Sequence, residues 1–122
     1  MNLTNLSNDE VLVGLHALVS QGRHVLARLL IYLGEVEERR LDLQSACSSL
    51  FEFCVRRLGL SEDEAYRRVL ASRIVRAFPT ALGMIERGEI HLTGLLLLRH
   101  HLSPENGEAL LSAAAGKSKS EL

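Results

Sequence analysis

"LGLSEDEAYRRV", residues 58–69, places a glycine, a helix cap and a pair of arginines within twelve residues, and the rest of the fold is predicted outward from it. Gly59 stands where a helix commonly ends in a left-handed residue, and Ser61 with Glu64 matches the capping box that begins a helix. These signals predict two helices joined by about three residues, the length of the corner in a helix-turn-helix. We place this unit at residues 49–78.

The composition predicts an all-α fold. Leu, Ala, Glu and Arg are abundant, 47% of the 122 residues are hydrophobic, and there are only two prolines. This composition favours helices over strands, and the length suits one domain. We expect a compact bundle of about five to six helices over residues 1–122, with residues 117–122 starting a linker or a further helix of a longer protein.

Residues 10–41 carry a long helical pattern. Ser7 and Glu10 match a second capping box, so this helix is expected to start near Asn8. Ser49 and Glu52 match a third. The shorter helices are expected at 49–58 and 62–78, on either side of Arg87-Gly88, and at 104–116.

The long helix is more apolar than a chain of this size can cover. Leucines and valines recur on one face of this helix and also occupy positions on either side of that face, which predicts that the helix is buried on more than one side. We therefore expect a homodimer or higher oligomer. The interface is expected at or near Leu15, Val19, Leu26 and Leu30.

Several classes of protein are disfavoured by the sequence. No apolar run reaches the ~18 residues of a membrane span, and no signal peptide is recognisable, so a cytoplasmic protein is expected. Cys47 and Cys54 lack a CxxC spacing and are interpreted as structural. His100 and His101 are adjacent and would point about 100° apart on a helix, so they cannot easily share one ion. We expect no metal, no cofactor, no catalytic residue and no enzymatic activity.

The charge distribution is uneven, although the formal net charge is only −1. Residues 56–76 carry six arginines against three acids, a local charge of +3 that leaves −4 for the remainder. Arg68, Ser72 and Arg76 are spaced to form one stripe, opposite Tyr66, Leu70 and Ile74. A recognition helix needs such a division between a packed face and a cationic face. The residues expected to contact double-stranded DNA are Arg67, Arg68, Ser72, Arg73 and Arg76.

The same arginines also suit a solvated helix face. Glu62, Asp63 and Glu64 fill the first turn of the helix, where carboxylates favour the helix dipole but repel a phosphate backbone. The pattern alone leaves DNA contact and a merely soluble face both open.

A family resemblance favours the nucleic-acid interpretation. The segments "CSSLFEFCVRRLGLSEDEAYRR", "RAFP", "GEIHLTGLLLL", "HLSPEN" and "GKSKSE" resemble the helical N-terminal region of bacterial HNH endonucleases of the myxobacterial type. Such proteins continue into a linker and a metal-dependent nuclease domain, and this sequence stops before either. The stretch from Leu58 is similar, more weakly, to the helix-turn-helix of partition proteins. The resemblance implies a DNA-binding module without its nuclease; the alternative is a protein interaction or dimerisation module that binds no nucleic acid.

Overall fold

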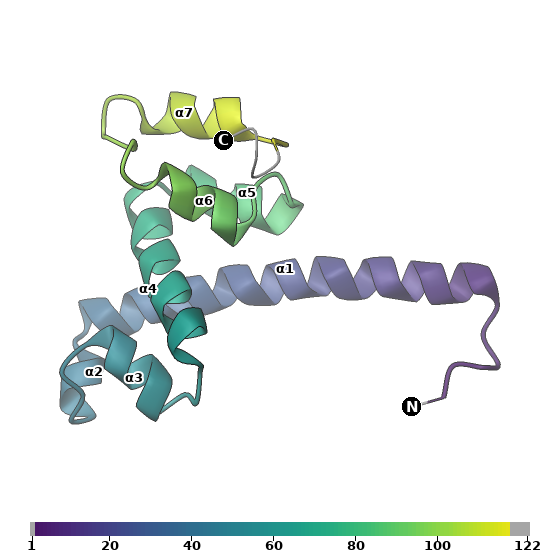
Figure 1. The fold of residues 1–122 in the computed structure, drawn as a ribbon, viewed down its shortest axis with the longest axis horizontal. Coiled ribbons are helices and arrows are strands. Elements are labelled where there is room, and N and C mark those ends of the chain that lie inside the picture. The colour runs from purple at the N-terminus through teal and green to yellow at the C-terminus, as the bar shows by residue number, and fades with distance from the viewer. Residues whose placement is uncertain (1, 118–122) are drawn as a thin grey trace.

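The structure, a computed structural model, describes residues 2–117 and is helical throughout its regular elements (Figure 1). The helices are α1 (Asn8–Glu38), α2 (Leu41–Gln44), α3 (Leu50–Arg56), α4 (Glu62–Ala77), α5 (Thr80–Arg87), α6 (Leu92–Leu98) and α7 (Gly107–Ala114). The prediction of an all-α fold is confirmed. Residues 118–122, where a linker or further helix is expected, lie outside the described range.

The predicted capping boxes at the starts of α1 and α4 and the predicted turn at Gly59 are confirmed. Ser61 accepts a hydrogen bond from the Glu64 amide at 3.1 Å, and the Glu64 side chain accepts one from the Ser61 amide at 3.2 Å. The same reciprocal pair joins Ser7 and Glu10 at the start of α1. Gly59 has a φ of +73°, a conformation that costs a glycine little and a branched residue much more. The chain therefore turns between α3 and α4 where the sequence indicates.

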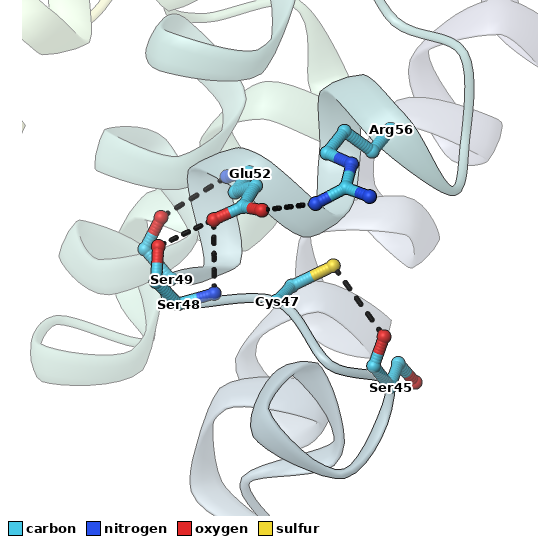
Figure 2. A network of polar contacts seen from close by, with 6 residues as sticks. All are labelled: Ser45, Cys47, Ser48, Ser49, Glu52 and Arg56. Atoms are coloured by element: carbon cyan, nitrogen blue, oxygen red, sulfur yellow. Dashed lines mark hydrogen bonds and ion pairs between the residues drawn. The ribbon is translucent and has the colours of Figure 1, made fainter.

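The start of α3 differs in detail from a simple capping box (Figure 2). Ser49 caps the helix by accepting from the Glu52 amide at 3.1 Å, but the Glu52 carboxylate bonds to both the amide and the hydroxyl of Ser48 instead of to Ser49. It also accepts from Arg56 Nη1 at 2.6 Å. The hydrogen bonds from Ser48, reinforced by Arg56, lower the pKa of Glu52 to about 2. Glu52 thus holds the preceding loop onto the helix.

The described chain has seven helices, one more than the upper end of the expected range, because the sequence carries no signal for α2. This four-residue helix has no side-chain cap, and it lies between two non-glycine residues with positive φ, Arg40 at 56° and Ala46 at 61°. Such conformations are uncommon outside glycine and asparagine, so residue type gives no warning of them. The helix is also too short to show a hydrophobic period.

Helix α4 lies at the centre of the fold and supplies both of its apolar clusters. Ala65 and Val69 pack with Leu33 of α1 and with Leu50 and Cys54 of α3. The other end of α4 packs with Leu30 of α1 and with α5, α6 and α7 in a larger cluster, to which it contributes Ala71, Ile74 and Val75. Since α1 and α4 contribute to both clusters, their contact joins the two ends of the molecule.

Helix α1 has 31 residues, about 46 Å at 1.5 Å per residue, and only its C-terminal half packs against the other helices. The N-terminal half projects away from them in Figure 1. We call residues 8–22 of α1 the arm. Every residue of the arm is exposed.

The last three helices follow the predicted breaks with one shift. Gly88 ends α5 in a left-handed conformation, φ +74°, as the Arg87-Gly88 break indicates. Helix α7 begins at Gly107 and not at Pro104. Ser103 and Asn106 instead bond reciprocally, at 2.8 and 3.3 Å, in a turn before the helix. Gly107 is required there because an added Cβ would lie 2.2 Å from Phe78.

The position of α1 in the core can be tested with two adjacent residues. Leu30 is 0% exposed and Ile31 is 48% exposed. Leu30→Ala is expected to lower the free energy of unfolding by about 2–5 kcal/mol, because it leaves a cavity between α1 and α4. Ile31→Ala should cost about 1 kcal/mol or less. Urea denaturation at one protein concentration measures both, and equal effects would contradict this orientation of α1.

Candidate functional site

The first candidate site is the arginine-bearing surface of α4, and its exposed face differs from the predicted one. The prediction that Arg68, Ser72 and Arg76 form one exposed stripe is wrong, because Ser72 is 1% exposed. Its hydroxyl donates a 2.7 Å hydrogen bond to the Val69 carbonyl, one turn back in the same helix. Tyr66, expected to hold the helix in place, is instead 51% exposed.

The outward face of α4 therefore passes through Tyr66, Arg73 and Ala77, with Arg76 at its edge. Arg67 and Arg68 lie on the flanks and are partly buried. Helix α4 packs against α1, α3, α5 and α6, so a broad part of its circumference is covered. The five predicted DNA-contacting residues do not share one surface.

Arg73 and Arg76 reach across the helix crossing to carboxylates of α1. Arg73 donates to both carboxylate oxygens of Glu37, at 3.1 and 2.8 Å. Arg76 lies 4.0 Å from Glu35 and 3.6 Å from Glu38. Because a guanidinium fits a carboxylate with two parallel hydrogen bonds, the Arg73 pair is the best formed of these contacts.

A glycine of α1 lies under Arg76 at the crossing. Gly34 is buried where the two helices meet, and a Cβ built on it would lie 3.2 Å from Arg76 Nη1. The side chain of Arg76 passes over this residue on its way to the α1 carboxylates. The Arg76 side chain therefore packs closely over Gly34.

Arg67 and Arg68 have polar partners in α6 and in the first turn of α4. Arg67 donates to Thr93 Oγ1 of α6 at 2.5 Å and lies 4.0 Å from Asp63. Arg68 lies 3.9 Å from Glu64. The Thr93 hydroxyl thus serves an arginine of α4, and α6 begins without a side-chain cap.

All four arginines of the predicted site thus have acidic neighbours. The acids come from the first turn of α4 and, unexpectedly, from the end of α1, where Glu35, Glu37 and Glu38 are close in sequence. The hydrogen bond from Arg73 lowers the pKa of Glu37, and the same bond raises the pKa of Arg73. The local charge of +3 along the sequence is balanced by residues that lie about forty positions earlier.

The second candidate site is the apolar surface of the arm. Its exposed large side chains are Val11, Leu12, Leu15, Leu18 and Val19, while Val13 is exposed on the other side of the helix. Of the four residues predicted in an interface, Leu15 and Val19 belong to this set, while Leu26 is partly buried against the larger cluster. Leu30 is fully buried in the chain's own core, so its placement in an interface is wrong. The leucine period continues along α1, but α4 and α5 already cover its later part.

The arm also carries an apolar groove. Leu3 and Leu6 of the N-terminal segment line it together with Val11, Gly14, Leu15 and Leu18, and its volume is about 240 Å³. Leu6 and Val11 occupy the two positions of a hydrophobic staple around the Ser7 cap. Apart from its chain neighbours and the backbone of its own helix turn, no atom lies within 4 Å of a Cβ built on Gly14, so the groove is open at this residue.

Residues 2–117 offer no metal site. No group of three or more His, Cys, Asp or Glu side chains in that range is arranged to hold a metal ion. His24 pairs with Glu86 of α5 at 3.1 Å. Within the same range, no helix is both long enough and apolar enough to cross a bilayer.

Comparison with known proteins adds no relative to this geometry: no family model, no curated protein and no solved structure matches the chain.

The α1–α4 ion pair predicts a dependence of stability on pH. A carboxyl whose pKa falls on folding stabilises the protein above its unfolded pKa, near 4.5 for Glu37, and loses that contribution as the pH falls through the folded value. Glu37→Gln is therefore expected to lower the free energy of unfolding at pH 7 by up to about 1 kcal/mol, the range of a partly exposed pair. The deficit should shrink as the pH is lowered below 4.5.

Chemical denaturation at pH 7, 5 and 3 measures this difference. Glu105→Gln provides the control, because Glu105 is exposed in a turn and is expected to change little. A Glu37→Gln deficit that stays constant across the three pH values would contradict the pairing.

Proposed function

We propose that this chain is a self-associating helical module that pairs with another copy through the arm of α1. The observation that carries the proposal is the exposure of five large apolar side chains along one side of the arm, Val11, Leu12, Leu15, Leu18 and Val19, which no described element covers. Single exposed apolar residues are ordinary, but a contiguous surface of them marks an interaction site.

The apolar surface of the arm continues the core-facing surface of α1. Leu12, Leu15 and Val19 recur at the same helical spacing as Leu26, Leu30 and Leu33. In the second half of the helix this face is packed by α4 and α5, and in the first half it meets solvent. Transfer of apolar area from water contributes about 25 cal/mol per Å², so covering the arm is favourable.

DNA binding is a second candidate, supported by the α3–α4 corner. Helices α3 and α4 are both capped, Gly59 turns the chain between them, and Arg73 and Arg76 are exposed on the second helix. The acidic partners of these arginines weigh against it, because a phosphate would have to compete with carboxylates that already neutralise them. Self-association therefore has the stronger support.

The first proposal predicts the mass of the chain in solution. At ~100 µM, well above the Kd of ordinary weak interfaces, light scattering should give at least twice the 13.5 kDa of one copy. Leu15→Glu is expected to return the protein to a single copy, because the carboxylate would be desolvated in the interface.

Val13→Glu is the matched control. Val13 is equally on the arm and exposed, but it projects from the opposite side of the helix to Leu15. Its substitution should leave the mass of the assembly unchanged. A wild-type chain that remains a single copy at ~100 µM would refute self-association.

If the chain binds DNA, the carboxylates of α1 compete with phosphates for Arg73 and Arg76. If Arg73 and Arg76 contact phosphates, then Glu37→Gln with Glu38→Gln removes their competitors and should strengthen binding to a duplex at low salt. Arg73→Ala with Arg76→Ala should weaken binding and reduce the log–log salt slope by about 0.9 for each phosphate that the variant no longer neutralises. Fluorescence anisotropy over a salt series measures both, and no binding by any variant at ~100 µM would reject this candidate.

A further inference from the structure

We infer that two copies of this chain pair through their arms in antiparallel orientation, with His16 of each copy level with the midpoint of the pair. This inference rests on the proposed self-association and adds its direction and register. It commits to a second copy of the chain as the occupant of the apolar surface. Two features of the arm support it: the placement of its charges and the groove at Gly14.

The charges of the arm are confined to its ends. From Val11 to Gly22 there is no charged side chain, and this segment is flanked by Asp9 and Glu10 on one side and by Arg23 on the other. In an antiparallel pair centred on His16, residue 9 of one copy lies level with residue 23 of the other. The acidic end of each arm thus meets the basic end of its partner.

The helical geometry also places Asp9 and Arg23 on the same edge of the apolar face. They are fourteen positions apart, which at 100° per residue brings them within about 40° of each other around the helix. In an antiparallel pair the same edges of the two helices face each other, whereas in a parallel pair opposite edges meet. A parallel pair would leave Asp9 and Arg23 about 21 Å apart along the axis. Exposed ion pairs add little affinity, but they select between such orientations.

Arg23 lies at the base of the arm, next to Gly88. A Cβ built on Gly88 would lie 2.5 Å from Arg23 Cζ, so the guanidinium lies against the turn between α5 and α6. The side chain remains partly exposed. Its charge therefore lies beside the base of the arm.

The groove receives a side chain in the same register. Gly14 of one copy is level with Leu18 of the other, and both residues lie on the edge opposite to Asp9 and Arg23. Leu18 is 64% exposed, while the space above Gly14 is empty and the apolar groove around it measures about 240 Å³. Leu18 of each copy thus enters the groove of its partner, a knob-into-hole contact made twice by the symmetry.

On the Asp9 edge, Leu12 of one copy lies within one residue, about 1.5 Å along the axis, of Val19 of the other. Two copies of Leu12 are by contrast eight residues, or about 12 Å, apart. A disulfide needs Cα atoms closer than about 7 Å. Introduced cysteines therefore distinguish the two orientations.

The experiment uses the full chain with Leu12→Cys and Val19→Cys as separate variants. Under mild oxidation an equal mixture of the two should form a disulfide between position 12 of one chain and position 19 of the other, identified by peptide mass, while each variant alone should stay largely uncrosslinked. The wild-type chain is the background control. Its Cys47 and Cys54 are both buried, and burial raises the pKa of the Cys54 thiol, which disfavours the reactive thiolate.

A second pair of variants tests the groove. Gly14→Leu fills the space above residue 14 and is expected to raise the dimer Kd at least tenfold. This increase is expected even though replacing a glycine inside a helix by itself stabilises the helix. Ala17→Leu adds a leucine outside the set of residues that line the groove, at a position that is also exposed, and should leave the Kd unchanged. Circular dichroism at low concentration checks that both variants keep their helix content.

The outcomes separate this inference from the proposal beneath it. Efficient crosslinking of either single variant, in a protein whose mass is that of a dimer, would overturn the antiparallel register and leave self-association intact. An unchanged Kd for Gly14→Leu would overturn the groove contact. A single-copy mass at ~100 µM together with no crosslink would remove both the inference and the proposed function.

Discussion

The crossing of α1 and α4 is the contact on which the rest of the structure depends. Both helices supply side chains to each of the two apolar clusters, so the α2–α3 end and the α5–α7 end are joined through them. Arg76 lies over Gly34 where the two helices cross, and two hydrogen bonds from Arg73 to Glu37 join the helices at the edge of the contact. One pair of helices thus fixes the core and also determines which charges of α4 remain available.

The ends of the helices could be predicted from sequence because the signals for them are local. Ser7, Gly59, Ser61 and Gly88 each act through their own backbone or through a residue three positions away, and each ends or begins a helix as expected. Helix α2 could not be predicted because its boundaries are set by left-handed Arg40 and Ala46, which their residue types do not announce.

The faces of the helices could be predicted less well, because they depend on partners distant in sequence. The prediction that Ser72 faces outward and Tyr66 inward assumes that only one side of α4 is buried. In the structure several helices pack around α4, so Ser72 is buried and Tyr66 is exposed. Small residues of α4 are buried, namely Ala65, Ala71 and Ser72, and α1, α3 and α6 all pack against this helix. The small size of these three side chains is the feature of the sequence that could indicate the buried face of α4. The pairing of the arginines with the acids at the end of α1 had no local signal, since it follows only from the crossing.

The continuity of α1 links the state of the arm to the amount of protein present. A helical segment of about fifteen residues without tertiary contacts is only marginally stable in water, and the arm has no such contacts in one copy. Since the packed half of α1 supplies a nucleus from which the arm extends, we expect any fraying to begin at the N-terminus of the arm. Under the proposed pairing, each encounter between copies supplies the missing contacts, and mass action then governs the length of ordered helix. Under this proposal, a higher concentration of the chain would lengthen the ordered part of α1 that extends beyond the core.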